Sequence, residues 1–340
     1  MAAKKMLVRR IAADRSQTLR RGMQALFLAL NVWIGLQFYL WVRYFETGGQ
    51  SPFAERPAGV EGWLPIASLM NLKVWIGTGA LPRIHPAGMF LFLAFFAMSW
   101  FFRKSFCSWL CPVGTVSEYL WRLGRKAVGR NFRLPGPLDV PLRGLKYLLL
   151  ALFLYAVARM SAGAIIEFLG GPYGLVDDVR MLNFFRTLGT AGVTVIAFLA
   201  VASLLVENFW CRYLCPYGAL LGLVGMASPV RIRRDEPLCI DCAKCAKACP
   251  ARLPVDRLIT IQSAECSACM ACVASCPAEG ALILSAPVRR RVPAWAVALG
   301  VAAIFLGIYS YAQWTGRWKT NLPERAYWEL VPRASEFSHP

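Results

Sequence analysis

Two cysteine runs between Cys239 and Pro277 constrain this 340-residue chain more than any other feature. They read CIDCAKCAKACP and CSACMACVASCP, and each has the spacing C-x2-C-x2-C-x3-C-P. Three cysteines spaced in this way let one tight loop place three sulfur atoms around a compact inorganic group, and the fourth leaves that loop. The spacing is that of the bacterial iron–sulfur run, in which the fourth cysteine binds the cluster of the other run.

This rule divides the eight cysteines between two 4Fe–4S clusters. The first set is Cys239, Cys242, Cys245 and Cys276, and the second set is Cys249, Cys266, Cys269 and Cys272. Zinc and disulfide bonds are the alternatives. Zinc sites favour two C-x2-C pairs with a longer gap between them, and zinc does not explain why a proline follows both runs. We therefore predict two 4Fe–4S clusters.

Hydrophobic residues make up 57% of the sequence, which is high for a soluble protein with this many charges. Long apolar runs of about 17 to 22 residues explain the excess, because runs of this length cross a bilayer as helices. The predicted spans are Ala25–Val42, Pro86–Phe102, Leu145–Ile166, Leu188–Val206 and Val292–Tyr311. The predicted fold is thus mostly α, a polytopic membrane protein of about five spans with an inserted α+β ferredoxin module that holds two clusters.

The net charge of +19 first suggests nucleic-acid binding, but the positions of the charges argue against it. If five helices alternate from a cytoplasmic N-terminus, 27 Lys and Arg residues fall in the inner segments and 9 in the outer ones. The positive-inside rule accounts for this asymmetry. We predict a bacterial inner-membrane protein in contact with lipid, with its N-terminus and ferredoxin module in the cytoplasm, its C-terminus outside, and no nucleic-acid partner.

A second cysteine motif occurs twice in the apolar part of the chain. Cys107-Ser108-Trp109-Leu110-Cys111-Pro112 and Cys211-Arg212-Tyr213-Leu214-Cys215-Pro216 both follow a predicted inward-going span, and a glycine comes two residues after each proline. The membrane part is therefore read as a duplicated two-helix unit. Two copies that run in the same direction favour a two-fold axis along the membrane normal.

Such an axis brings Cys107, Cys111, Cys211 and Cys215 together at the inner face. If each C-x3-C segment begins a helix, one turn separates its two thiols and both face the same side. Soft thiolates suit a third iron–sulfur cluster, copper or zinc, so the ligand type alone does not choose between them. Redox-active dithiols and purely structural thiols are further alternatives.

These motifs divide the chain into four predicted segments. They are a basic cytoplasmic N-terminus (1–22), a duplicated membrane domain (23–228), a ferredoxin-like domain (229–288), and a final span with an outer tail (289–340). Outside the cysteine motifs, His85 is read as a proton acceptor for a quinol or as an interfacial hydrogen-bonding residue. Asp177 and Asp178 are read as proton-passing groups or as a solvated turn.

Two C-x3-C-P elements followed by a two-cluster ferredoxin run resemble the membrane-bound polyferredoxins of the NapH, NosR and CcoG-like group, over residues 60–290. The chain lacks the additional outer domains of the NosR and CcoG types and extends past the usual NapH end, which indicates a separate branch. The resemblance implies electron transfer associated with quinol oxidation and a partner redox protein, or metal handling during oxidase assembly.

We therefore expect a membrane-anchored carrier of single electrons between a quinone pool or cytoplasmic donor and a partner redox complex. No Ser-His-Asp set, phosphate loop or flavin motif is visible, which favours a carrier or redox subunit over a self-contained enzyme. The alternatives are an assembly factor that reduces or delivers copper for a respiratory enzyme, and a scaffold whose clusters are structural.

Overall fold

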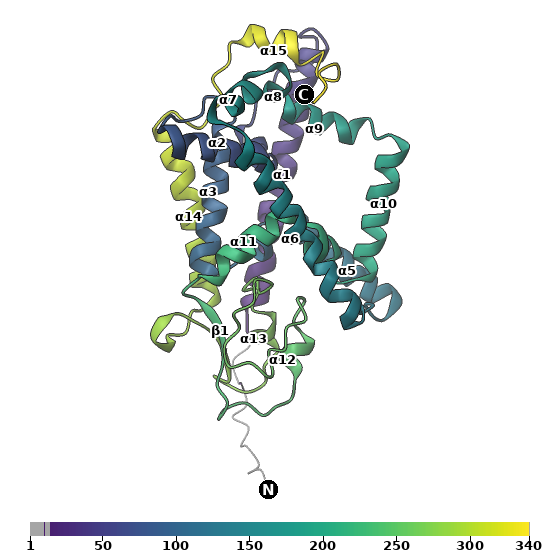
Figure 1. The fold of residues 1–340 in the computed structure, drawn as a ribbon. Coiled ribbons are helices and arrows are strands. Elements are labelled where there is room, and N and C mark those ends of the chain that lie inside the picture. Colours follow the sequence, from purple (N-terminus) through teal and green to yellow (C-terminus); the bar gives the residue numbers. More distant parts are fainter. Residues whose placement is uncertain (1–9, 11–13, 340) are drawn as a thin grey trace. The chain divides into compact units, whose positions relative to one another are not determined.

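The computed structural model describes residues 10 and 14–339, and most of the predicted basic segment 1–22 therefore lies outside the described residues. Helices dominate the described part of the chain (Figure 1). The five longest apolar helices are α1 (Ser16–Glu46), α3 (Pro86–Phe102), α6 (Gly136–Arg159), α10 (Thr190–Leu205) and α14 (Ala294–Trp314). The shorter elements are η1 (Ala58–Trp63), α2 (Pro65–Thr78), α4 (Ser105–Trp109), α5 (Pro112–Val128), α7 (Ala162–Gly170), α8 (Pro172–Leu175), α9 (Asp177–Arg186), η2 (Trp210–Leu214), α11 (Pro216–Met226), β1 (Arg231–Arg234), α12 (Lys244–Lys247), α13 (Ala271–Ser275), β2 (Leu282–Ser285), η3 (Pro287–Arg289) and α15 (Glu324–Leu330).

Contacts divide the chain into two compact units. Unit 1 comprises the described residues up to Leu28 together with Phe95–Leu150 and Phe198–Ile304, and unit 2 comprises Ala29–Ala94, Ala151–Ala197 and the described residues from Phe305 onward. All twelve cysteines belong to unit 1. The unit boundaries fall inside the five long apolar helices, so each of these helices contributes to both units.

The apolar helices expose large hydrophobic side chains that water would not stabilise. Leu26 and Leu148 are 74% and 66% exposed, and Trp295 on α14 is 61% exposed. By length and composition, α1, α6 and α14 can each cross a membrane, and α9 with α10 forms a fourth candidate that is bent by 81°. The predicted helical membrane fold is confirmed. The count of five spans stays a prediction, since α3 has 17 residues and falls just short of the length for a span.

The third predicted span differs from the structure. The apolar run Leu145–Ile166 is divided between α6, which ends at Arg159, and α7, which begins at Ala162. Ser161 causes the new start, because its hydroxyl accepts a hydrogen bond from the backbone N–H of Ala164 and caps α7. The predicted span Pro86–Phe102, in contrast, matches α3 at both ends.

Unit 1 contains the ferredoxin-like segment, whose two strands pair antiparallel with Arg231 opposite Ser285 and Arg234 opposite Leu282. The alternating residues of Leu253–Ile261 also predict a short strand, but this segment makes only an isolated bridge between Arg233 and Thr260. The inner face of this small sheet is apolar, with Ile232 and Leu284 each 1% exposed.

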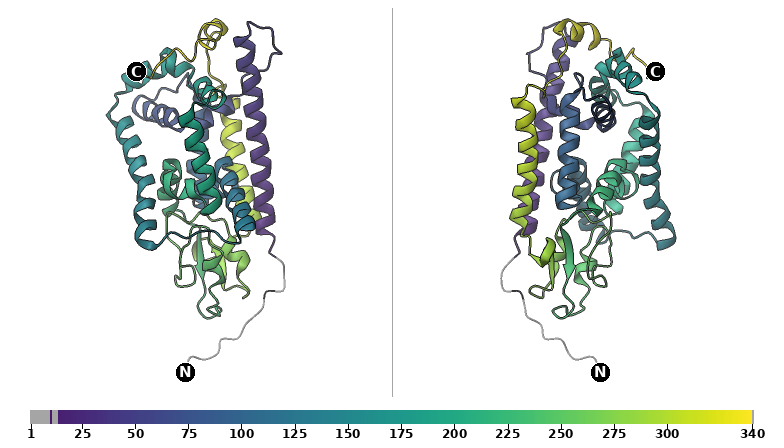
Figure 2. Two further views of the ribbon diagram at one scale, coloured as in Figure 1. Left: turned by 90° about the vertical axis from the view of Figure 1, so that its right-hand side faces the viewer. Right: turned by 60° about the vertical axis from the view of Figure 1, so that its left-hand side comes forward.

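Two apolar cores lie in the described part of unit 2. One gathers Phe38, Trp41, Phe45 and their neighbours from α1 with Val331 near the C-terminus, and the other packs α2 against α7 through Met70, Val74, Ile165 and Leu169. The parts of α3 and α14 that belong to unit 2 run side by side (Figure 2), and the rings of Phe90 and Tyr311 lie 6.3 Å apart.

Candidate functional site

The first predicted cysteine set lines one cavity in unit 1. The cavity is bordered by Cys239, Cys242, Cys245 and Cys276 and by Arg234 of β1. Cys276 follows α13 directly, and the other three cysteines lie in the loop that leads into and through α12. The structure thus brings together three cysteines of the first run and the last cysteine of the second run.

The second predicted set lines a separate cavity with the reciprocal arrangement. Cys266, Cys269 and Cys272 come from the second run, and Cys249, which follows α12, comes from the first. Burial and the neighbouring Cys269 raise the pKa of Cys249 to about 12. A lone thiolate is therefore unfavourable here, and a cationic group that bonds to sulfur would remove this cost.

The backbone of both loops has an unusual and repeated shape. Asp241 and Ala243 have φ of 56° and 53°, and Ala268 and Met270, each 27 positions later, have φ of 50° and 57°. Non-glycine residues in this left-handed region cost about 1–3 kcal/mol each, and such strain gathers at functional sites. In each run, these left-handed residues lie between the first and third cysteines, and they turn the first three thiols of that run toward one cavity.

The four C-x3-C-P cysteines also meet. Cys107, Cys111, Cys211 and Cys215 line a single cavity of about 180 Å³ in unit 1. The expectation that each C-x3-C segment begins one helix is wrong. The first cysteine of each pair lies in a short helical turn, α4 or η2, and the second is the N-cap of the next helix, α5 or α11.

The C-P-x-G sequence explains this local geometry. The backbone N–H of Gly114 donates to the sulfur of Cys111 at 3.4 Å, and that of Gly218 donates to Cys215 at 3.2 Å. Proline suits the first helical position because the N–H it lacks would have no helical partner there. A Cβ on Gly114 would lie 2.4 Å from the carbonyl oxygen of Cys107, so this turn excludes any larger residue.

Buried charges surround the four-cysteine cavity. Lys104 lines it and is 6% exposed, and Lys146 lies 2.6 Å from both carboxylate oxygens of Glu265. Burial alone would lower the pKa of Lys104, but Cys107 and Glu265 outweigh this effect and raise it. Burial raises the pKa of Cys107 to about 11, against the opposing effect of Lys104. The cations favour anionic sulfur in this cavity.

The four-cysteine cavity and the second cysteine set are direct neighbours. Cys269 and Glu265 line both cavities. Ser108, between Cys107 and Cys111, donates its hydroxyl hydrogen to the carbonyl of Ser267 at 2.6 Å, and the indole N–H of Trp109 donates to Ala268 at 3.2 Å. The thiols of the second and first sets also adjoin, since Cys245 lies close enough to raise the pKa of Cys272, although burial is the main cause. The second set therefore adjoins both of the others.

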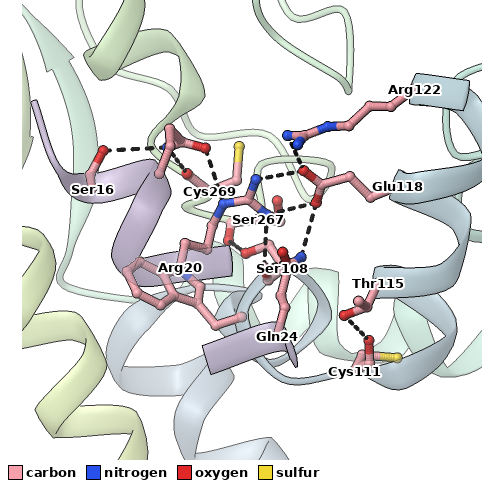
Figure 3. Close-up of polar contacts among 12 residues, drawn as sticks. Ser16, Arg20, Gln24, Ser108, Cys111, Thr115, Glu118, Arg122, Ser267 and Cys269 are labelled. Carbon is pink, nitrogen blue, oxygen red and sulfur yellow. Dashed lines mark hydrogen bonds and ion pairs between the residues drawn. The ribbon is translucent and has the colours of Figure 1, made fainter. Parts of the chain in front are cut away.

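A buried network fastens the first turns of α1 to this region (Figure 3). The guanidinium of Arg20 donates to both carboxylate oxygens of Glu118 on α5, at 2.7 and 2.6 Å, and to the carbonyl of Ser108 at 3.0 Å. Gln24 donates to the same two partners at 2.9 and 3.0 Å, and Gln17 donates to the carbonyl of Cys269 at 2.9 Å. These contacts hold the turn between Cys107 and Cys111 against the loop that carries Cys269.

Within residues 10 and 14–339, no three His, Cys, Asp or Glu side chains are gathered tightly enough to hold one metal ion. This applies to the first and second cysteine sets and to the C-x3-C-P set alike.

Sequence reasoning did not assign roles to Lys104, Glu265, Arg20 or Glu118. Two of them had a local signal, because Lys104 lies three residues before Cys107 and Glu265 lies directly before Cys266. Arg20 and Glu118 had none, since 98 residues separate them.

The candidates outside the cysteine motifs, His85, Asp177 and Asp178, meet in a buried polar cluster of unit 2. His85 is 1% exposed, and its ring nitrogens lie 3.6 Å from Glu61 and 3.1 Å from Asp177. Arg56 pairs with Glu61 at 2.9 Å and with Asp178 at 2.6 Å. Asp177 and Asp178 therefore belong to an interior network, and Asp178 is only 1% exposed.

This cluster predicts a pH-dependent stability. Burial alone would lower the pKa of His85, but Asp177 and Glu61 outweigh it and raise the pKa well above 6.5. The charged His85 therefore contributes its full stabilisation below pH 6.5 and loses it as the pH rises through the raised pKa. We expect the Tm in detergent to fall over that range, by about 1–2 °C per kcal/mol lost.

The two histidines of the chain provide a matched control for this prediction. His85→Gln should flatten the dependence of Tm on pH, and His339→Gln should leave it unchanged. Equal slopes for the wild type and His85→Gln would contradict the assignment to His85.

Comparisons with known proteins agree with this geometry. The family described as "4Fe-4S binding domain" matches twice, over residues 84–131 and 188–234, and each match contains one C-x3-C-P motif. The family described as "4Fe-4S dicluster domain" matches residues 231–277. No solved structure matches the chain.

Several curated proteins are similar to this chain. YccM of Escherichia coli, which bears the provisional name of an electron transport protein, is 48% identical over 328 residues, covering 95% of this chain and 92% of YccM. The ferredoxin-type protein NapH of E. coli is 27% identical, covering 62% of this chain and 71% of NapH. The regulatory protein NosR of Pseudomonas aeruginosa is 29% identical, covering 62% of this chain and 30% of NosR. The chain belongs to the membrane-bound polyferredoxins, the group of iron–sulfur electron-transport proteins that includes YccM and NapH.

Proposed function

We propose that this protein passes single electrons between three neighbouring cysteine-held centres. The observation that carries the proposal is that the cavity of the second set shares Cys269 with the C-x3-C-P cavity, while Cys272 of the second set lies near Cys245 of the first. Iron–sulfur clusters supply one-electron chemistry when bound. The chain's part is to hold adjacent centres at fixed positions and to set their potentials through nearby charges.

The proposed ligands follow the three sets. The first two clusters are held by Cys239, Cys242, Cys245 and Cys276, and by Cys249, Cys266, Cys269 and Cys272. Cys107, Cys111, Cys211 and Cys215 hold a third cluster. The repeated family match over both C-x3-C-P motifs supports an iron–sulfur group at the third site. Lys104 and Lys146 support it electrostatically, because buried cations offset the negative charge of a thiolate-ligated cluster.

The first set and the C-x3-C-P set, which both adjoin the second set, are assigned the proposed partners. The first set exchanges electrons with a cytoplasmic donor, and the C-x3-C-P site exchanges them with the quinone pool or with a partner redox complex in the membrane. The asymmetry of 27 inner and 9 outer basic residues supports a cytoplasmic ferredoxin-like segment in a bacterial inner membrane, with the C-terminus outside. The names of the relatives support a carrier or redox subunit rather than a self-contained enzyme.

Metal analysis of anaerobically purified protein, together with EPR redox titration, tests the proposal. We expect about twelve iron atoms per chain, and about eight after all four C-x3-C-P cysteines are changed to serine. Iron-free, colourless protein would overturn the proposal. Copper that disappears with the four serines, with iron constant at about eight, would instead establish the metal-handling assembly factor.

A further inference from the structure

The last turns of α5 and the loop that follows it carry a dense group of cations. The segment 119–138 contains five Lys and Arg residues and no acidic residue. We propose that the exposed side chains of residues 116–133, the α5 surface, bind the headgroups of anionic phospholipids. This inference is independent of electron transfer and concerns the lipid chemistry that the protein contacts.

Packing fixes which side of α5 is exposed. A Cβ on Gly124 would lie 1.8 Å from the carbonyl oxygen of Leu204, so α5 contacts the last turn of α10 directly through its backbone. Both of these segments belong to unit 1, where α5 lies beside the end of α10 (Figure 1). Another side of α5 carries Val116, Tyr119 and Leu123, which lie three and four residues apart and therefore form one stripe. They are 46%, 46% and 58% exposed, so α5 presents an apolar stripe outward.

The loop after α5 is held in place by its backbone. The N–H of Phe132 donates to the carbonyl of Leu205, the last residue of α10, at 2.8 Å. The guanidinium of Arg252 donates to the carbonyl of Phe132, also at 2.8 Å. Arg130 and Arg133 flank Phe132 and are exposed, and Phe132 itself is 45% exposed. Two cations and an aromatic ring therefore have a fixed place beside the end of α10.

The acidic residues of this region do not balance its cations. Three carboxylates form ion pairs here, and each of them faces two arginines: Glu118 faces Arg20 and Arg122, Glu207 faces Arg125 and Arg252, and Asp139 faces Arg143 and Arg212. Lys126, Arg130 and Arg133 add to this excess. All three are exposed, and they form no ion pair within the part of the chain that the structure describes. The α5 surface is therefore positive after every such pairing is counted, which favours an anionic ligand.

The neighbouring apolar helices indicate that this ligand is a lipid. Phe198 and Val201 of α10 are 61% and 54% exposed, and Val140 of α6, which begins directly after the loop, is 66% exposed. Such side chains contact lipid tails, so cations at the end of α10 lie where the headgroup phosphates begin. A helix with an apolar stripe beside its cations is the usual composition of an interfacial helix. A soluble acidic partner would account for the cations but not for the exposed apolar stripe.

Native mass spectrometry of the full-length protein in detergent tests this surface, because it counts bound lipids one by one. We expect anionic phosphatidylglycerol to bind more tightly than zwitterionic phosphatidylcholine. Lys126→Gln/Arg130→Gln/Arg133→Gln should weaken phosphatidylglycerol binding about tenfold or more, since each cation near a membrane surface adds to the attraction. Phosphatidylcholine binding should stay unchanged. The charge-conserving variant Lys126→Arg/Arg130→Lys/Arg133→Lys should bind phosphatidylglycerol like the wild type.

The control variant is Arg83→Gln/Arg317→Gln/Arg325→Gln, which removes the same charge from exposed residues of unit 2. It should keep the wild-type affinity for phosphatidylglycerol. Equal weakening in both glutamine variants, or none in either, would overturn the assignment to the α5 surface. Displacement of phosphatidylglycerol by inorganic phosphate or by polyglutamate would also overturn it, because it would show an anion site without a preference for lipid. Every variant should keep the wild-type iron content, which separates this test from that of the proposed function.

Discussion

Cys249→Ser should remove about four iron atoms from the chain while the cluster of the other set stays loaded. The reason is the crossed arrangement, in which Cys249 comes from the first run but lines the cavity of Cys266, Cys269 and Cys272. The remaining three thiols leave one corner of the cluster without a sulfur ligand. Iron analysis and EPR of the reduced protein measure the loss.

Double variants show which cluster is lost. Cys249→Ser/Cys272→Ser should lose no more iron than Cys249→Ser alone, because both residues belong to one set. Cys249→Ser/Cys242→Ser should lose about eight atoms, since it disrupts both sets. If the two double variants exchanged these results, each run would hold its own cluster and the crossed assignment would be wrong. Ser275→Ala, next to Cys276, is the control that should lose none.

Arg20→Met should destabilise the protein by about 3–5 kcal/mol, the typical effect of removing one partner from a buried ion pair. The side chain of Arg20 is 3% exposed and that of Glu118 is 13% exposed, and Arg20 also donates to Ser108 in the C-x3-C-P turn. Without Arg20, the Glu118 carboxylate loses its main counter-charge. Thermal unfolding in detergent, followed by the bleaching of the iron–sulfur absorbance, measures the change.

Arg21 is the matched control, because it neighbours Arg20 and is exposed. Arg21→Met should change stability by less than about 0.5 kcal/mol. The double variant Arg20→Met/Glu118→Gln should recover part of the loss, because it no longer leaves an unpaired buried charge. Equal destabilisation by the Arg20 and Arg21 changes would show that the network in Figure 3 does not stabilise the fold.

The features that sequence reasoning anticipated have local causes. The helix Pro86–Phe102 follows from an uninterrupted apolar run that begins with proline. The division of Leu145–Ile166 into two helices was missed, although Ser161 is a good helix cap, because hydropathy alone does not register capping. The expected strand within Leu253–Ile261 was reduced to a single bridge, because pairing depends on what lies opposite a segment as well as on its own residues.

The sequence by itself determined the sets of cysteines, since the C-x2-C-x2-C-x3-C-P and C-x3-C-P spacings are short and the chemistry of sulfur needs no distant partner. It also determined the helical membrane fold, because apolar runs of span length have few other stable structures. Only the tertiary structure decided the charges around the sites. Lys146 lies against Glu265, Arg20 against Glu118 and His85 between Glu61 and Asp177. Each of these pairings joins residues that are far apart in the chain, so no local sequence pattern predicts it. Only the packing of the helices brings the charges together, and burial then strengthens the attraction between them.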